Sequence, residues 1–195
     1  MAQSRTLVLA STSSYRKALL ARLGLAFEVA SPGVDEGVLP AESPAQTALR
    51  LSVLKARSQE RRFPDALIIG SDQVAAAGEE RYGKPGDHEA AVRQLRSLSG
   101  KALDFHTAVT LLDARTRQLE SRVVACRVFW RPLDERRIEA YLRREQPYDC
   151  SASAKAEGLG IALIERIQTD DPSSLIGLPL IALSEMLERA GLPVV

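Results

Sequence analysis

Residues 66–74 of this chain read Ala-Leu-Ile-Ile-Gly-Ser-Asp-Gln-Val. The apolar run 66–69 predicts a buried strand, and Gly70 is expected to end it. Three polar residues, Ser71, Asp72 and Gln73, follow at once. Open α/β sheets build ligand sites beyond the ends of their strands, so this stretch predicts both a sheet and a site.

The same order of apolar strand and polar loop occurs upstream. Residues 6–10 (TLVLA) predict a buried strand that leads into a Ser/Thr cluster, and residues 15–23 have the spacing of an amphipathic helix. Residues 26–30 predict a second strand. Ser43 and Pro44 are typical of an N-cap and a first helical residue, so a long helix is expected from there.

The downstream half adds a hairpin to this alternation. Two β-like runs separated by polar residues predict an antiparallel part of the sheet. The expected elements are a helix at 87–98, strands at 103–112 and 119–130, a helix at 134–144, a last core strand at 161–167 and a terminal helix at 180–190. We therefore predict one domain over residues 1–195, a mixed, twisted α/β sheet flanked by helices.

Composition narrows the function classes. The chain has 195 residues, 45% of them hydrophobic, and 26 Lys plus Arg against 25 Asp plus Glu give a net charge of +1. Such a chain has no global basic field for nucleic acid, so an anionic ligand must be held locally. No apolar run reaches the length of a signal peptide core or a membrane span. We expect a soluble cytoplasmic protein whose two cysteines, Cys126 and Cys150, are reduced.

The first polar loop, Ser11 to Lys17, is a candidate phosphate cradle. Hydroxyl groups, loop amides at a helix N-terminus and the guanidinium of Arg16 suit a phosphate. An ordinary serine N-cap followed by a solvated basic turn is the alternative.

A second candidate group is Asp35-Glu36 with Lys55 on the helix beyond. Carboxylates in a loop can coordinate a hard cation, and a lysine can neutralise a phosphate. The alternative is a solvated turn and an exposed helix lysine.

Asp72 and Lys84 form the third group. An acid at a strand end can hold a metal-bound water or take its proton, and a lysine in the Gly83-Lys84-Pro85 turn can meet a leaving phosphate. An Asx-turn and a surface turn are the alternatives.

Other residues are left outside the site. His88 and His106 lack zinc-ligand spacing, and Phe129 and Trp130 are expected in the core. The segment Gly158-Leu159-Gly160 precedes a strand and lacks a third glycine, so it does not predict a dinucleotide loop.

Taken together, these motifs resemble the Maf-like nucleotide pyrophosphatases. The segments LASTSSYRKALL (9–20), VDE (34–36), IIGSDQV (68–74), GKP (83–85), SAKAEGLGI (153–161) and SSLIGLPL (173–180) follow that family in order and spacing. The resemblance implies a fold related to inosine triphosphate pyrophosphatases, with a central cleft. It also implies hydrolysis of a nucleoside triphosphate between its α and β phosphates with a divalent cation, Mg or Mn, and a possible homodimer.

The resemblance also implies roles for single residues. Asp72 matches the family's proton acceptor and, with Glu36, its metal-binding groups. Lys55 and Lys84 match groups that handle the phosphates, and Ser11 and Arg16 belong to the cradle.

Three departures point to one branch of the family. Tyr15 stands where the common S-x-S-P-R-R start has its first arginine, Gln73 follows the catalytic Asp, and Glu157 lies in KAEGLG. These three resemble the branch that acts on 7-methyl-GTP. A cationic 7-methylguanine suits the face of an aromatic ring, and a carboxylate can accept from guanine N–H groups. The alternatives are a dTTP/UTP or an inosine/xanthosine triphosphate pyrophosphatase, and a nucleotide-sensing division regulator.

Overall fold

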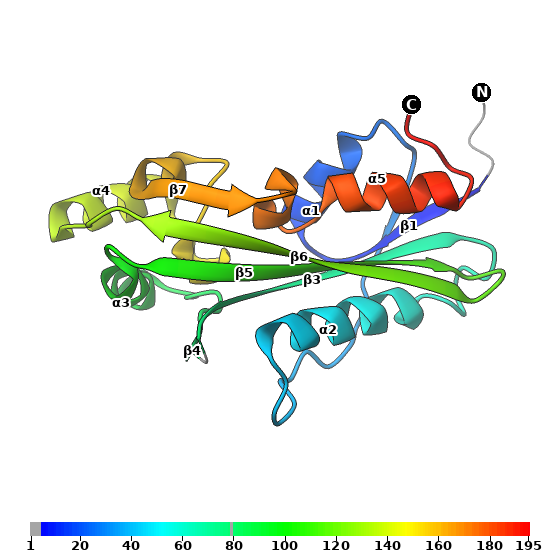
Figure 1. The fold of residues 1–195 in the computed structure, drawn as a ribbon, viewed down its shortest axis with the longest axis horizontal. Helices are drawn as coiled ribbons and strands as arrows, with labels where there is room; N and C mark the ends of the chain where they lie inside the picture. The colour runs from blue at the N-terminus through cyan, green and yellow to red at the C-terminus, as the bar shows by residue number, and fades with distance from the viewer. Residues whose placement is uncertain (1–4, 79) are drawn as a thin grey trace.

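The protein was analysed as a computed structural model that describes residues 5–78 and 80–195 (Figure 1). Its elements are β1 (Leu7–Ala10), α1 (Ser14–Ala21), β2 (Glu28–Ala30), α2 (Pro44–Ser58), β3 (Leu67–Ala77), β4 (Glu80–Arg81), α3 (His88–Leu98), β5 (Ala102–Asp113), β6 (Gln118–Trp130), α4 (Glu135–Glu145), the 3₁₀ helices η1 (Ser151–Ser153) and η2 (Leu159–Leu163), β7 (Ile164–Thr169), η3 (Pro172–Ile176) and α5 (Leu180–Arg189).

One mixed sheet organises these elements. Within the described residues, seven strands form it in the order β2-β1-β3-β5-β6-β7, with β4 paired to the end of β3. Strands β2, β1 and β3 run parallel, whereas β3, β5, β6 and β7 pair antiparallel in turn. The predicted mixed sheet and its central hairpin are confirmed.

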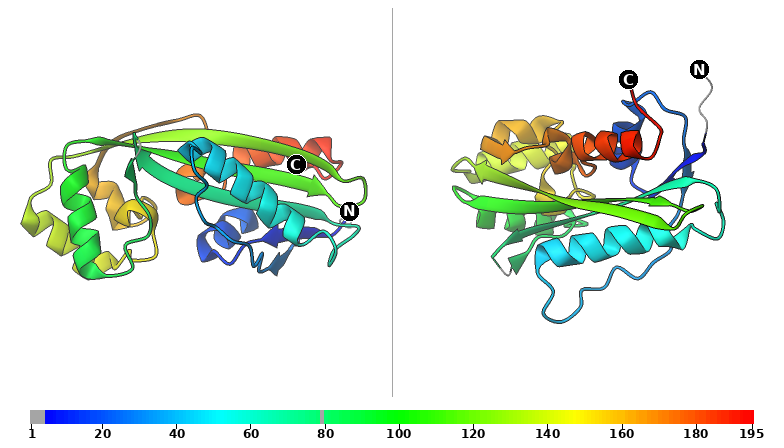
Figure 2. Two further views of the ribbon diagram at one scale, coloured as in Figure 1. Left: turned by 90° about the horizontal axis from the view of Figure 1, so that it is seen from below. Right: turned by 45° about the vertical axis from the view of Figure 1, so that its right-hand side comes forward.

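Apolar packing covers both faces of the sheet. Leu67 and Ile69 pack in a cluster with residues of α1 and α5, while Ile68 between them packs with Ala56 of α2. This explains the unbroken apolar run at the start of β3, because a strand buried on both faces needs no polar alternation. Helices α3 and α4 lie together at the other end of the molecule (Figure 2).

The prediction that the strand ends at Gly70 is wrong. Strand β3 continues to Ala77. A Cβ atom at Gly70 would lie 2.0 Å from the Ser52 carbonyl oxygen and 2.6 Å from the Ala56 nitrogen, so glycine serves the close approach of α2 to the strand. Asp72 and Gln73 therefore lie inside a long strand.

The site opens where β3 loses its parallel neighbour. Strand β1 pairs with β3 only as far as Ala10 opposite Gly70, and β4 joins β3 only at Ala76. Among the described residues, positions 71–74 of β3 have no strand beside them on that edge. This free edge forms the floor of the cleft.

Two further outcomes concern element ends. The predicted start of α2 is confirmed, with Ser43 as the N-cap and Pro44 as the first helical residue. The structure adds a capping box, since the Ser43 hydroxyl accepts from the Gln46 nitrogen and the Gln46 side chain accepts from the Ser43 nitrogen. The prediction of a last core strand at 161–167 is wrong in part, because residues 159–163 form η2 and β7 is an exposed edge strand.

No helix in the described part of the chain is long and apolar enough to cross a membrane.

Candidate active site

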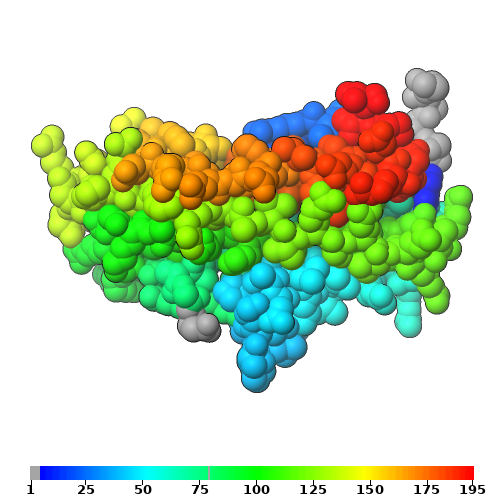
Figure 3. Space-filling view, in the orientation of Figure 1, coloured from blue at the N-terminus to red at the C-terminus, as the bar shows by residue number. Residues whose placement is uncertain are grey.

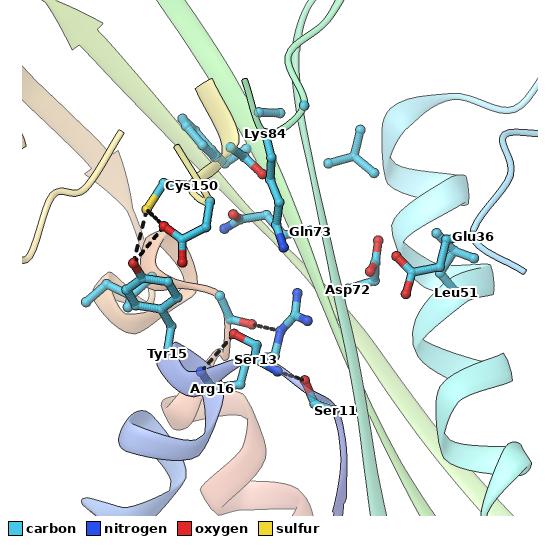
Figure 4. A pocket seen from close by; sticks show the side chains of 18 of the residues that line it. Ser11, Ser13, Tyr15, Arg16, Glu36, Leu51, Asp72, Gln73, Lys84 and Cys150 are labelled. Carbon is cyan, nitrogen blue, oxygen red and sulfur yellow. Dashed lines mark hydrogen bonds between the residues drawn. The ribbon is translucent and has the colours of Figure 1, made fainter. Parts of the chain in front are cut away.

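A cavity of about 520 Å³ lies along the free edge of β3. All nine residues predicted for the site line it: Ser11, Tyr15, Arg16, Glu36, Lys55, Asp72, Gln73, Lys84 and Glu157. They come from the loop after β1, α1, the loop before α2, α2 itself, β3, the turn after β4 and the loop before η2. Asp72 and Glu36 lie on one side, beside α2, with Tyr15 and Cys150 on the other (Figure 4).

Lys55 joins the two carboxylates of the site. Its Nζ atom lies 2.6 Å from Asp72 Oδ1 and 2.9 Å from Glu36 Oε1. The side chains of Lys55 and Asp72 are only 5% and 10% exposed, and a charge buried to this extent requires a partner of opposite sign. The alternative of an exposed helix lysine is therefore wrong.

Backbone geometry explains why these groups meet. Successive side chains of a strand point to opposite faces, so Asp72 shares the face of Ile68 and Gly70, which is the face covered by α2. Gly70 lets α2 approach closely enough for Lys55 to reach Asp72. Glu36 lies in the segment that leads into α2, and this segment projects from the molecule (Figure 3). The Glu36 side chain is 57% exposed.

The two carboxylates suit a hard divalent cation. No group of three or more His, Cys, Asp or Glu side chains in the described residues could hold a metal alone. Magnesium sites at nucleotides, however, commonly use one or two protein carboxylates together with phosphate oxygens. Asp72 and Glu36, held beside each other by Lys55, fit that donor set.

Arg16 brings a guanidinium to the end of the cavity nearest α1. Ser13 caps α1 by accepting from the Arg16 nitrogen at 3.3 Å, and the Ser11 hydroxyl accepts from the Ser13 nitrogen at 3.1 Å. Arg16 Nε donates to the Gly177 carbonyl at 2.8 Å. Desolvation lowers the pKa of Arg16, while Asp72 and Glu36 oppose this shift, so the guanidinium stays charged.

Lys84 contributes a second cation from the opposite rim (Figure 4). The Gly83 carbonyl accepts from the Ala152 nitrogen at 3.1 Å and from Gln94 Nε2 at 3.0 Å, which holds the turn that carries Lys84. In the described residues, the Lys84 ammonium forms no ion pair. It is available to an anionic ligand.

Tyr15 is held by its hydroxyl group. The phenol donates to Asp149 Oδ1 at 3.2 Å and accepts from Cys150 Sγ at 3.4 Å. Burial, followed by the neighbouring Cys150 and Asp149, raises the pKa of Tyr15, so the phenol is neutral. The fixed hydroxyl sets the orientation of the ring at the cavity wall.

Gln73 points to the face of the sheet opposite Asp72. Its Nε2 atom donates to Thr107 Oγ1 and to the Ser174 and Leu175 carbonyls at 2.9, 2.9 and 3.0 Å. The amide nitrogen is thus taken up by the protein, and the amide oxygen is left as an acceptor.

Glu157 lines the cavity from the loop before η2, and it is exposed. Glu145 of α4 holds that loop, since it pairs with Lys155 at 2.6 Å and accepts from the Leu159 nitrogen at 2.7 Å. A Cβ atom at Gly158 would lie 2.7 Å from Glu145 Oε2, so a larger residue there would displace the Glu145 carboxylate.

A family model for Maf-like proteins matches residues 6–190. This chain belongs to the Maf-like family. Curated relatives include a 7-methyl-GTP pyrophosphatase of Thiobacillus denitrificans, 59% identical over 98% of this chain and 95% of the relative. Another protein of that name, from Cupriavidus pinatubonensis, is 54% identical over 96% of this chain and 94% of the relative.

Among solved structures, the Ham1 protein of Staphylococcus aureus is similar, with a TM-score of 0.45 and 14% identity over 65% of this chain and 72% of that one.

The cavity of this Maf-like chain has further lining residues that the sequence analysis missed. Arg81 of β4 donates to Thr47 Oγ1 at 3.1 Å and to the Glu42 carbonyl at 2.8 Å, which ties the Lys84 turn to the start of α2. Asp149 and Cys150 hold Tyr15 from 134 and 135 residues away. No local spacing reveals contacts of this kind.

His88, His106, Phe129 and Trp130 do not line the cavity. Trp130 lies in the core as expected, whereas the same expectation for Phe129 is wrong, because Phe129 is only partly buried, with Arg166 over its ring. Both cysteines are free thiols and buried.

Proposed function

We propose that this Maf-like chain is a nucleoside triphosphate pyrophosphatase that hydrolyses 7-methyl-GTP to 7-methyl-GMP and pyrophosphate. One observation carries the proposal. A charged group, Asp72 with Lys55 and Glu36, lines the same cavity as a second group, Tyr15, Gln73 and Glu157. The names of the relatives quoted above support the choice of substrate.

Asp72 is proposed as the proton acceptor for the attacking water. Lys55 Nζ lies 2.6 Å from Asp72 Oδ1 and holds that side chain in place, and a positioned carboxylate can take a proton from a bound water. Asp72 and Glu36 would hold the divalent cation, Mg or Mn. When bound, such an ion polarises phosphate oxygens and lowers the pKa of a coordinated water.

Arg16 and Lys84 are proposed to hold the triphosphate from two sides. Neither forms an ion pair with a described carboxylate, so both can meet phosphate charge. Lys84 is expected to act on the leaving pyrophosphate, where negative charge grows as the α–β bond breaks. The Ser11 hydroxyl belongs to the same cradle.

The other wall is proposed to select the base. The Tyr15 ring attracts the positive charge of 7-methylguanine. The free oxygen of the Gln73 amide and the Glu157 carboxylate accept from the N1–H and exocyclic amine of guanine. Uracil and thymine lack the amine and offer a carbonyl there instead, so acceptors at both positions disfavour them.

We further propose a single catalytic domain that works in the cytoplasm, with a homodimer as its candidate assembly. The expectation of no nucleic-acid or membrane partner rests on the near-zero net charge and on composition.

Product analysis tests the activity. The purified chain is incubated with 7-methyl-GTP, GTP, UTP, dTTP and inosine triphosphate, with magnesium or manganese and with EDTA. We expect 7-methyl-GMP and pyrophosphate in equal amounts, only with metal. Orthophosphate with a diphosphate product would indicate a different reaction, preferred hydrolysis of UTP or inosine triphosphate a different substrate, and absence of turnover a non-enzymatic role.

A further inference from the structure

Helix α5 begins without a cap of its own. Pro179 occupies its N-cap position and has no side-chain acceptor for the free N–H groups of the first turn. Asp171 and Ser173 supply the acceptors instead. Ser173 Oγ accepts from the Leu180 nitrogen at 2.7 Å, and Asp171 Oδ2 accepts from the Ile181 and Ala182 nitrogens at 2.8 and 3.3 Å.

Asp171 and Ser173 are also bonded to each other. The Ser173 hydroxyl donates to Asp171 Oδ1 at 2.6 Å, and the Ser173 nitrogen donates to the same oxygen at 3.2 Å. The Asp171 residue is only 3% exposed, so its carboxylate depends on these donors for its stability. We call this pair the α5 latch. It fixes both ends of the segment 172–179.

The carbonyl groups of the latched segment face the site. Those of Ser174 and Leu175 accept from Gln73 Nε2, and that of Ser174 also accepts from the Thr107 hydroxyl at 2.9 Å. The Gly177 carbonyl accepts from Arg16 Nε at 2.8 Å and from the Ser71 hydroxyl at 3.0 Å. Two cavity residues, Gln73 and Arg16, are thus held by hydrogen bonds to the segment 172–179.

These contacts determine which way the Gln73 amide points. The Thr107 hydroxyl donates its one proton to the Ser174 carbonyl, so toward Gln73 it can only be an acceptor. A flipped amide would place its oxygen against two carbonyls and an acceptor hydroxyl. As long as the segment stays in place, the cavity receives an acceptor, which suits guanine donors. Release of the segment would allow the amide to present a donor, which suits the carbonyl-rich pyrimidines.

We propose that Asp171 and Ser173 are positioning residues for nucleobase selectivity, acting through the carbonyls of 174–175 on the Gln73 amide. This inference rests on the proposed function, since it assigns the selectivity of the same site. Neither residue touches the substrate in this proposal.

Ser173→Ala is the main test, with Ser99→Ala as its matched control. Ser99 Oγ also accepts a backbone N–H at 2.7 Å, from Leu133, and lies outside the cavity. Both variants should lose similar thermal stability. We expect the ratio of kcat/KM for 7-methyl-GTP over UTP to fall about 5- to 100-fold in Ser173→Ala, and to stay unchanged in Ser99→Ala. An unchanged ratio in Ser173→Ala overturns the proposal.

A double-mutant cycle separates positioning from general loosening. In a Gln73→Met background there is no amide to orient, so Ser173→Ala should change the ratio no further. Full additivity of the two changes would contradict the proposed route through Gln73. Asp171→Asn should act in the same direction if it folds, and Ser173→Ala carries the test if it does not.

A structural readout keeps the proposal independent of the activity. The side-chain NH₂ resonances of Gln73 in the ligand-free protein should show slow hydrogen exchange in the wild type and in Ser99→Ala, and fast exchange in Ser173→Ala. If the wild type does not hydrolyse 7-methyl-GTP but this pattern holds, the proposed function fails while the latch stands. Identical exchange in all three proteins would remove the latch.

Discussion

Asp72 and Gln73 are neighbours in the chain but belong to two different environments. Asp72 faces α2 and is surrounded by charge, from Lys55 and Glu36. Gln73 faces η3 and is surrounded by neutral hydrogen-bond partners, two carbonyls and a hydroxyl. A strand places consecutive side chains on opposite faces, so one peptide bond separates the proposed chemistry from the proposed choice of base. The two functions should therefore respond to different substitutions.

The largest effect is expected on the Asp72 side. Asp72→Asn should lower kcat by roughly 10²- to 10⁴-fold, because an amide cannot take a proton from water. The ratio of kcat/KM for 7-methyl-GTP over UTP should not change, since Gln73 is untouched. Steady-state kinetics on a variant with an unaltered circular dichroism spectrum checks this, and near-normal turnover would remove Asp72 as the base.

Glu36→Ala should act on the same side but more weakly. Loss of the carboxylate should lower activity at limiting magnesium by roughly tenfold or more, the scale on which metal sites respond to lost supporting groups. Saturating magnesium should restore most of the activity, and selectivity should be unaltered. A metal titration of both proteins decides the matter, and identical magnesium dependence would argue against metal binding by Glu36.

Glu157→Gln should reverse this pattern. The anionic acceptor for guanine is lost, while the Asp72 group is intact. A lost hydrogen-bond partner alters discrimination by about 1 to 3 kcal/mol, and the exposure of Glu157 favours the lower end of that range. Competition between 7-methyl-GTP and UTP measures the change. An equal fall in kcat for both substrates would contradict the assignment of Glu157 to the choice of base and would place it with the Asp72 group in the chemical step.

Tyr15 should give the smallest effect. Tyr15→Ala is expected to narrow the preference for 7-methyl-GTP over GTP by about 0.5 to 1 kcal/mol, the value of a cation–π contact at a partly exposed site. Tyr15→Phe keeps the ring and loses only the bonds to Asp149 and Cys150. It should narrow the preference less than Tyr15→Ala does, because the ring is still present, and equal losses in both variants would show that the hydroxyl, not the ring, matters.

The sequence predicted local features well, because they depend on neighbouring residues. The cap at Ser43, the apolar runs of the strands and the hairpin of β5 and β6 all follow from short-range patterns. Six family segments in register also contain eight of the nine predicted site residues, and all nine line the cavity together with others that were not predicted.

Contacts formed between distant segments could not be predicted in this way. The partners of Tyr15 lie more than a hundred residues away, and Gln73 is held by main-chain carbonyls, which every residue type possesses. Gly70 was misinterpreted for a related reason. A glycine in a strand pattern has the same local appearance whether it ends the strand or admits a helix.

Gly70 also sets the distance between α2 and β3 at the proposed reaction centre. Because the Ser52 carbonyl lies where a Cβ atom would be, the separation of helix layer and sheet layer is set by a missing methyl group. The length of the Lys55 side chain is fixed, so the separation of the two layers determines whether Nζ can contact Asp72 Oδ1 at 2.6 Å. Even an alanine at position 70 would push α2 away from β3 and lengthen the distance from Lys55 Nζ to Asp72 Oδ1. Asp72 would then lose the positive charge that is paired with it.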